Sequence, residues 1–172
     1  QNEPDNTGDP REVVTKIEDL LAVWPELMAT GKRLGSPAMS GNLNMLYQFL
    51  DSIDARGWRC DFVTVHSYWY SDWGSWLWNF NNIHNRTGRP LWITEMNYGA
   101  NWTGWPAGND RSGSASNLAI EKRHMAPILD GLESTGYVER YAFYNHVQDC
   151  RAAYLNGSLT PIGEYYANLE SG

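Results

Sequence analysis

The sequence lacks the features of several protein classes. Its 172 residues include only two cysteines, Cys60 and Cys150, too few for a scaffold held together by disulfides. No apolar run approaches the roughly 20 residues that a membrane-spanning helix needs. Lys and Arg form no basic run, and 13 basic against 20 acidic residues give a formal charge of −7. We therefore expect neither a nucleic acid nor a membrane as partner.

Phenylalanine is also scarce, whereas the other aromatic residues are abundant. The chain has 4 Phe beside 9 Trp and 10 Tyr. Burial alone would use Phe equally well, but Trp and Tyr add a polar group to a flat apolar ring. Such rings also stack on the apolar face of a sugar. A Trp-rich core is the alternative interpretation, but the grouping of Trp within residues 69–78 and 102–105 favours a binding cleft.

Hydrophobic periodicity predicts alternating strands and helices. The predicted helices span residues 10–31, 44–56, 73–84, 116–134 and 162–169. The predicted strands span residues 33–38, 62–68, 91–95 and 137–144. A polar loop is expected at 97–113, and Asn156-Gly157 is typical of a tight hairpin turn. This alternation predicts an α/β fold with a parallel sheet, with residues 1–172 forming one domain or part of one.

Two acidic residues lie where predicted strands end. Glu95 closes the strand 91–95 and by alternation shares a face with Leu91 and Ile93. A carboxylate that continues an apolar face is costly unless it has partners or a function. Glu3 lies in Asn2-Glu3-Pro4, just before the first helical pattern. A salt-bridged loop residue at 95 and a helix-end charge at 3 are the simpler interpretations, so neither signal is specific by itself.

Together the two acids resemble a known pattern. Asn2-Glu3-Pro4 and, 92 residues after Glu3, the end of Trp92-Ile93-Thr94-Glu95 resemble motifs of the retaining glycosidases built on (β/α)8 TIM barrels. The resemblance implies that Glu3 ends strand four as acid/base and Glu95 ends strand seven as nucleophile. Residues 33–38 and 62–68 would be strands five and six. This fold carries catalytic groups at the C-terminal ends of its strands.

Further segments narrow the resemblance to glycoside hydrolase family 128. The matching segments, in order, are 2–5, 35–38, 61–68, 92–95 and 157–163. The resemblance covers residues 1 to about 169. It implies endo-acting cleavage of β-1,3-glucan with retention of configuration. It also implies that the chain is the C-terminal half of one catalytic barrel, from the end of strand 4 to strand 8.

The chemistry of such enzymes explains why both acids are needed. Glycosidic bonds break through an oxocarbenium-like state. Glu95 would attack the anomeric carbon, while Glu3 would protonate the departing oxygen and then deprotonate water. Retention needs carboxyl groups about 5–5.5 Å apart, with Glu3 protonated while Glu95 is ionised. The resemblance also implies that Asn2 hydrogen-bonds the sugar 2-hydroxyl.

Several other side chains are candidates for substrate contacts. His66 and Tyr68 share the inward face of strand 62–68; a satisfied core histidine is the simpler interpretation, but their place near the strand's end favours the cleft. The further candidates are Trp69, Asn97, Tyr98, Trp102 and Trp105, with Trp69 and Trp102 preferred as stacking platforms. No cofactor or metal is predicted, because His84, His124 and His146 lack zinc-site spacing.

Half a barrel would expose strand edges and an apolar face. We therefore expect the barrel to be completed by a missing N-terminal segment or a second chain. The expected partner is a β-glucan polysaccharide, and the expected location is secreted or extracellular, or periplasmic in a bacterium. Three alternatives remain: another retaining β-glycosidase, a non-catalytic β-glucan-binding protein, and a fragment inactive without its other half. Cys60 and Cys150, at opposite ends of the barrel, are expected not to be bonded to each other.

Overall fold

The computed structural model describes residues 2–8, 15–145 and 147–169. Its elements are α1 (Ile17–Ala29), α2 (Leu43–Ala55), β1 (Val63–Ser67), α3 (Trp73–Thr87), β2 (Leu91–Met96), α4 (Ala115–Glu133), β3 (Val138–Phe143), the 3-10 turn η1 (Asp149–Arg151), β4 (Tyr154–Leu155), β5 (Ser158–Leu159) and α5 (Pro161–Ala167). The predicted alternation of strands and helices is confirmed. The predicted start of the first helix, near Pro10, lies outside the described residues.

The sheet is parallel, with strand order β1-β2-β3. Isolated parallel bridges extend it on the β1 side, joining Gly35 to Phe62, Met39 to Val65 and Asn2 to Ala38. The predicted strand 33–38 therefore exists only as isolated bridges. The sheet follows chain order, as in consecutive strand–helix units. Within the described ranges, no strand pairs with the outer edge of β3.

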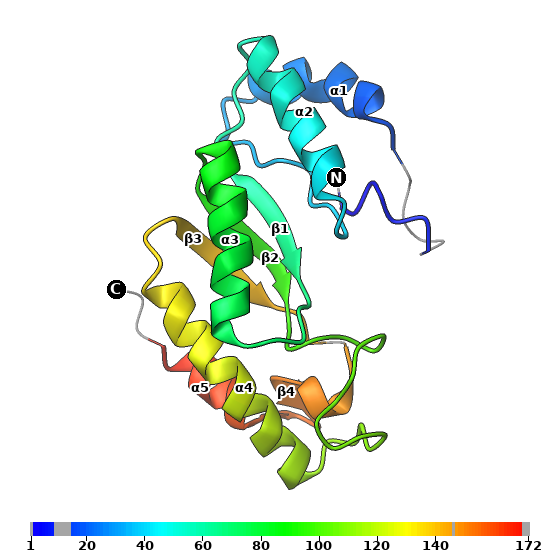
Figure 1. Cartoon of the computed structure of the whole chain (residues 1–172), viewed down its shortest axis with the longest axis vertical. Coiled ribbons are helices and arrows are strands. Elements are labelled where there is room, and N and C mark those ends of the chain that lie inside the picture. Colours follow the sequence, from blue (N-terminus) through cyan, green and yellow to red (C-terminus); the bar gives the residue numbers. More distant parts are fainter. Residues whose placement is uncertain (1, 9–14, 146, 170–172) are drawn as a thin grey trace.

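The helices cover one face of this sheet and form the core with it (Figure 1). The alternate residues Val63, Val65, Leu91 and Ile93 point into the helix layer and are buried. They pack in one cluster with apolar side chains of the helices, including Phe49, Ile53, Trp76, Phe80, Met125 and Ile128. Each large apolar side chain buried in this way contributes roughly 1.5–3 kcal/mol.

Local signals fix where the helices start, and so where the connecting loops lie. The side chain of Asn42 accepts a hydrogen bond from the Met45 amide at 3.0 Å and caps α2. Asp72 caps α3 through the Ser75 amide at 2.9 Å. The loops that precede both helices follow the C-terminal ends of neighbouring parallel segments, so they share one rim of the sheet.

Smaller features also agree with the sequence. Asn156 and Gly157 both have positive φ, 50° and 84°, and they join β4 to β5 in the predicted tight turn. Cys60 and Cys150 are both free and buried, which confirms that they are not bonded to each other. Among the described helices, none has the length and apolar character required to cross a membrane.

Candidate functional site

Glu95 reaches the site through a bulge in β2. Val65 pairs with Ile93, but the next residue, His66, pairs with Glu95, so Thr94 is an extra residue. Paired residues of neighbouring strands point to the same side of a sheet, and Glu95 therefore lies on the side of His66. The expectation that Glu95 shares a face with Ile93 is wrong, because a bulge interrupts strict alternation.

Glu3 lies on a constrained backbone. Its φ is 36°, in the left-handed region, which costs a non-glycine residue on the order of 1 kcal/mol. Its amide donates to the Ala38 carbonyl at 2.7 Å, and its carbonyl accepts from the Asn6 amide at 3.0 Å. These bonds fix the direction of the Glu3 side chain.

Asp5 fastens the Glu3 segment to the neighbouring loop. Its carboxylate accepts from the Ser40 amide at 2.7 Å, the Ser40 hydroxyl at 3.1 Å and the Asn42 amide at 3.0 Å. Three hydrogen bonds to one carboxylate, each charge-assisted, make a firm attachment. Residues 2–6 are thereby held against the start of α2.

Glu3, His66 and Glu95 meet at the rim of the sheet. Nδ1 of His66 lies 2.8 Å from Oε1 of Glu3 and 3.7 Å from Oε2 of Glu95. One ligand atom from each residue can be chosen so that all three lie within 4.8 Å of one another. The side chains of Glu3 and Glu95 are 17% and 24% exposed, whereas that of His66 is 2% exposed. The carboxylates thus remain open to a ligand above a buried imidazole.

Each carboxylate also has a hydrogen-bond donor of its own. The Tyr68 hydroxyl donates to Oε2 of Glu95 at 2.6 Å. The side-chain nitrogen Nδ2 of Asn6 donates to Oε2 of Glu3 at 2.7 Å. Burial, followed by the hydrogen bond to Glu95, raises the pKa of Tyr68 far above its usual value. Tyr68 therefore remains a protonated donor throughout the physiological pH range.

Nitrogen and carboxylate oxygen atoms are also ligands for transition metals. The trio of Glu3, His66 and Glu95 could hold a divalent ion. The histidines weighed in the sequence lie elsewhere: Nδ1 of His84 contacts the Arg89 carbonyl, and the His124 ring stacks on Tyr98. His146 lies outside the described residues. The hydrogen bond between His66 and Glu3 already accounts for the closeness of the trio, so we assign no metal to it.

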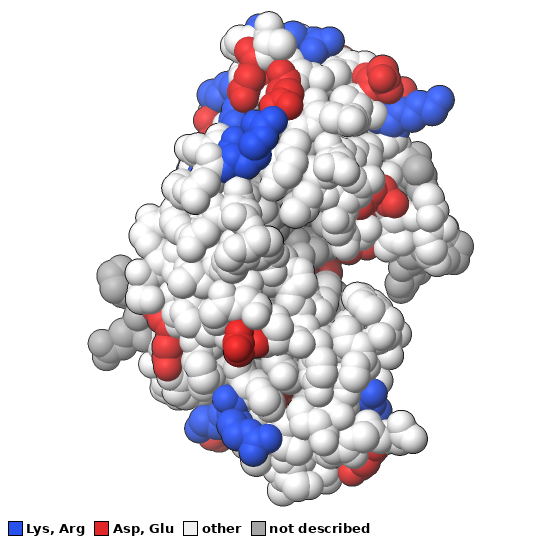
Figure 2. Space-filling model, in the orientation of Figure 1, with Lys and Arg blue, Asp and Glu red and all other residues white. Residues whose placement is uncertain are grey.

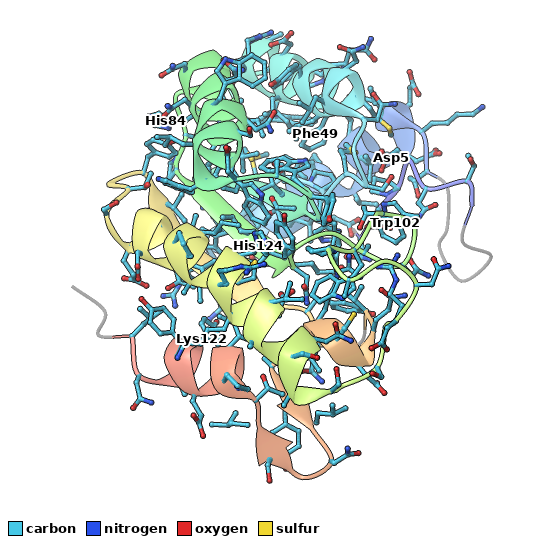
Figure 3. All side chains as sticks on the ribbon, turned by 60° about the horizontal axis from the view of Figure 1, so that its bottom comes forward. Asp5, Phe49, His84, Trp102, Lys122 and His124 are labelled. Atoms are coloured by element: carbon cyan, nitrogen blue, oxygen red, sulfur yellow. The ribbon has the colours of Figure 1, made fainter. Side chains whose placement is uncertain are left out.

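A cavity of about 200 Å³ is lined by His66 and Tyr68, the two side chains that contact the carboxylates, but not by Glu3 or Glu95 themselves. His66, Tyr68, Trp69 and Trp102 line it, together with the segment that precedes α2 and one side of α3. Trp102 is 73% exposed, and its ring meets the edge of Tyr68 with 5.7 Å between centroids. Asp5 and Trp102 lie on the same side of the molecule (Figure 3). The cavity and the exposed indole form a surface on which a sugar ring could stack.

The other predicted contact residues have different positions. Asn2 is exposed and lies next to Glu3, at the bridge to Ala38. The half-buried Trp69 lines the cavity, but its ring also packs on Trp76 and Phe80, with centroids 5.3 and 5.0 Å away. Asn2 is thus the chain neighbour of Glu3, and Trp69 forms part of the cavity wall.

Asn97, Tyr98 and Trp105 are all buried, and their hydrogen bonds and ring contacts are to groups other than the carboxylates. Asn97 donates to the carbonyls of Tyr144 and Arg151, both at 3.0 Å. Trp105 donates from its ring nitrogen to the Asn117 side chain at 3.0 Å. These side chains hold the loop 97–113 against the rest of the fold. A loop aromatic that packs inward has the same local sequence signal as one that faces outward.

Sequence reasoning missed Asp5, Asn6 and Arg151. Asp5 and Asn6 follow Pro4, and Asp and Asn are typical of turns in which their side chains bond backbone amides. This signal does not predict which distant residues the two side chains contact. The side chain of Arg151 is buried and donates to the carbonyls of Tyr98 at 2.7 Å and Gly104 at 2.6 Å. No local pattern marks it, because its partners are about fifty residues away.

Comparison with known proteins identifies related glycoside hydrolases. A family model described as glycosyl hydrolase catalytic core matches residues 1–166. A subgroup I GH128 endo-β-1,3-glucanase from Amycolatopsis mediterranei, solved as a mutant with laminarihexaose, is 26% identical with a TM-score of 0.81; the match covers 98% of this chain and 70% of that one. No curated protein sequence gives a match.

Two more distant structures share the fold. A subgroup V GH128 exo-β-1,3-glucanase from Cryptococcus neoformans is 22% identical with a TM-score of 0.74, over 96% of this chain and 66% of that one. A GH39 β-xylosidase from Caulobacter crescentus is 16% identical with a TM-score of 0.59, over 99% of this chain and 41% of that one. Similar parallel strands and helices therefore occur in enzymes that act on different substrates.

Proposed function

Because the chain belongs to the glycosyl hydrolase catalytic core family, and within it to glycoside hydrolase family 128, we propose that it is a retaining endo-β-1,3-glucanase. Glu95 is the nucleophile and Glu3 the acid/base. The observation that carries this proposal is the meeting of two partly exposed carboxylates around His66, at the C-terminal ends of parallel segments.

The spacing of the two acids supports retention. A retaining enzyme needs its carboxyl groups roughly 5–5.5 Å apart, whereas an inverting enzyme needs about 6.5–9.5 Å to admit a water molecule. Chosen oxygen atoms of Glu3 and Glu95 lie within 4.8 Å of each other. Oxygen atoms this close favour the shorter, retaining spacing and direct attack by Glu95.

The first step requires an ionised and oriented nucleophile. The Tyr68 hydroxyl, 2.6 Å from Oε2 of Glu95, donates to that oxygen and fixes the rotamer of the side chain. Glu95 attacks the anomeric carbon while Glu3 gives its proton to the departing oxygen. The products of this step are a covalent glycosyl-enzyme and a shortened glucan.

The second step reverses the role of Glu3. Now ionised, it takes a proton from water, whose oxygen attacks the anomeric carbon and releases Glu95. His66 and Asn6, both within 2.8 Å of the Glu3 carboxylate, are the groups that stabilise its charge. The net reaction consumes one water for each bond that is broken.

Substrate recognition is proposed for the side chains that remain accessible. Asn2 bonds the 2-hydroxyl, and Trp69 and Trp102 provide apolar faces beside the cavity. The laminarihexaose complex of the Amycolatopsis enzyme supports a β-1,3-linked ligand. The endo mode rests on likeness to the same subgroup, since another member of family 128 is an exo-enzyme.

We also propose that the five neighbouring segments are strands four to eight of a (β/α)8 barrel. The parallel order of Asn2, residues 35–39, β1, β2 and β3 supports this assignment. Closure would need strands one to three between β3 and the Asn2 segment, from another segment or a second chain. A protein that reaches such polysaccharides acts outside the cell, so we propose a secreted or periplasmic location.

Reducing-sugar release from curdlan and laminarin, with cellulose and xylan as controls, tests the proposal. We expect release from the β-1,3-glucans alone, with several oligosaccharide sizes among the early products. Proton NMR of those products should show the β-anomer first. Release from xylan instead would favour another glycosidase of the same clan, whereas glucan binding without release would favour a non-catalytic binder.

A further inference from the structure

The outer surface of α3 carries almost no charge. Charged residues make up 19% of the chain, but the 15 residues of α3 include one, Arg86. Both oxygens of the Asp51 carboxylate on α2 accept from Arg86 at 2.8 Å, so its charge is already paired. A helix that faces water usually carries charged residues on its outer side. Another property must therefore account for this surface.

Contacts on three sides of α3 define which residues face outward. Trp76, Phe80 and Ile83 are buried in the core. On the α4 side, the Trp73 ring lies where a Cβ on Gly131 would collide with it, and on the α2 side Arg86 reaches Asp51. The exposed and uncharged residues are Gly74, Ser75, Trp78, Asn82 and Asn85, which we name the outer α3 face.

Trp78 dominates this face, with 66% of its surface exposed. Residues three and four positions away on a helix are its neighbours. They are Gly74 and Ser75 on one side and Asn81 and Asn82 on the other. Asn81 accepts from the Tyr137 hydroxyl, so the exposed groups that flank the ring are the Ser75 hydroxyl and the Asn82 amide. In Figure 2 the surface over α3 is white between charged side chains near its two ends.

The chemistry of the face limits what can bind to it. A flat apolar ring suits the apolar face of a sugar, and amide and hydroxyl groups suit its hydroxyls. An acidic polymer would need free cations, and a basic peptide would need free acids. The nearest charged groups are already engaged: Asp72 accepts from the Ser75 amide, and Arg86 pairs with Asp51. A neutral polysaccharide is the ligand class that matches both the ring and the absence of charge.

We propose that the outer α3 face is a second glucan-binding site, separate from the cavity that His66 and Tyr68 line. Trp78 is not among the residues that line that cavity, to which α3 contributes Asn79 and Ile83. The identity of the polymer as β-1,3-glucan rests on the proposed function. A second site of this kind holds the protein on an insoluble polymer while the cavity acts on one strand.

Trp78→Ala tests the site, with Tyr154→Ala as the matched control. Tyr154 is another exposed aromatic residue, 53% exposed, on β4. Both substitutions remove exposed side chains, so neither should affect folding strongly. Each is combined with Glu95→Gln, which prevents hydrolysis, and sedimentation with curdlan is compared with that of the Glu95→Gln parent.

We expect Trp78→Ala to weaken curdlan binding about three- to tenfold, and Tyr154→Ala to leave it unchanged. In the background that retains Glu95, Trp78→Ala should slow hydrolysis of curdlan but not of laminarihexaose. Equal binding by Trp78→Ala and its parent would overturn the site. An equal loss of hydrolysis rate on curdlan and on laminarihexaose would show that the outer α3 face is not separate from the cavity. If the parent protein binds curdlan through Trp78 but does not hydrolyse β-1,3-glucan, the proposed function is rejected while the second binding site stands.

Discussion

Tyr68 donates a hydrogen bond to Oε2 of Glu95, with 2.6 Å between the two oxygen atoms. The two residues come from the ends of adjacent parallel strands, so the bond joins two loops at the rim. Because the pKa of Tyr68 is raised far above its usual value by burial and by Glu95, the hydroxyl keeps the proton that it donates to the Glu95 carboxylate. This arrangement holds Glu95 in one rotamer before any substrate arrives.

Tyr68→Phe should therefore lower kcat about ten- to hundredfold, because a hydrogen bond to a charged group contributes about 1.5–3 kcal/mol. KM should change little, since the ring that lines the cavity is retained. Steady-state kinetics on laminarin would measure both. Tyr154→Phe, which removes an exposed hydroxyl on β4, is the control. An unchanged kcat for Tyr68→Phe would show that Glu95 needs no orienting donor.

Glu3→Gln and Glu95→Gln should each reduce turnover of β-1,3-glucan at least about a hundredfold. Both are partly exposed side chains, so the thermal midpoint should stay close to that of the parent. The matched control is Glu139→Gln, which alters an exposed acid that pairs with Arg33. Rates like those of the parent in either active-site variant would refute the assignment.

The elements of the fold were accessible to sequence reasoning, because they depend on local patterns. Alternating Val63 and Val65, the apolar run 91–93 and the Asn156-Gly157 turn all predicted structures that are present. The prediction of a strand at 33–38 holds only in part. Pro37 has no amide proton to donate, and only isolated bridges form there. Periodicity cannot detect such an interruption of hydrogen bonding in advance.

The site was only partly accessible, because it depends on contacts between distant residues. Glu3 and Glu95 were found from their motifs, but the side on which Glu95 lies depends on one extra residue, Thr94, in the pairing with β1. Burial of Tyr98 and Trp105 follows from a loop path fixed by Arg151, far along the chain. Neither feature leaves a local signal.

Trp102→Ala should weaken glucan binding without affecting stability. The indole is 73% exposed, so its loss should change the free energy of unfolding by less than about 0.5 kcal/mol. Loss of stacking should raise KM about three- to tenfold. Kinetics on laminarin and chemical denaturation provide the two measurements. Unaltered KM would remove Trp102 from the proposed cleft.

Arg151→Lys should loosen the loop that carries Trp102. The guanidinium donates to the carbonyls of Tyr98 and Gly104 and lies over the Trp105 ring, 4.7 Å from its centroid. Lysine cannot reproduce this planar fork, and buried acceptors left unpaired cost about 1–3 kcal/mol each.

Limited proteolysis should then cut within residues 97–113, and KM should rise more than kcat falls. The control is Arg33→Lys. Arg33 forms an exposed ion pair with Glu139, and such a pair contributes about 0–1 kcal/mol to the free energy of unfolding. A uniform loss of stability with native protease resistance of the loop would contradict a positioning role for Arg151.

Glu121→Gln should stabilise the protein increasingly as pH rises. Glu121 is fully buried in α4, and burial raises its pKa well above the usual value, against the opposing effects of Arg151 and the Tyr98 backbone. A carboxyl whose folded pKa is raised contributes its stability below the unfolded pKa of about 4.3 and loses it as pH rises through the folded pKa.

Glutamine does not titrate. The difference in free energy of unfolding between the two proteins should therefore be smallest at pH 4 and should grow toward pH 8. Urea unfolding at several pH values measures the difference. A variant less stable than its parent at pH 8 would show that ionised Glu121 is instead stabilised by Arg151.

The three hydrogen bonds of Asp5 have a mechanical consequence. They join the Glu3 segment to Ser40 and Asn42, and Ser40 also lines the cavity. The proposed proton donor, Glu3, and one wall of the cavity therefore move as a single body. A ligand that displaces this wall also carries the donor with it, so a poorly seated ring meets a misaligned acid. Selectivity for the correct sugar can in this way be expressed in the rate of bond cleavage as well as in affinity.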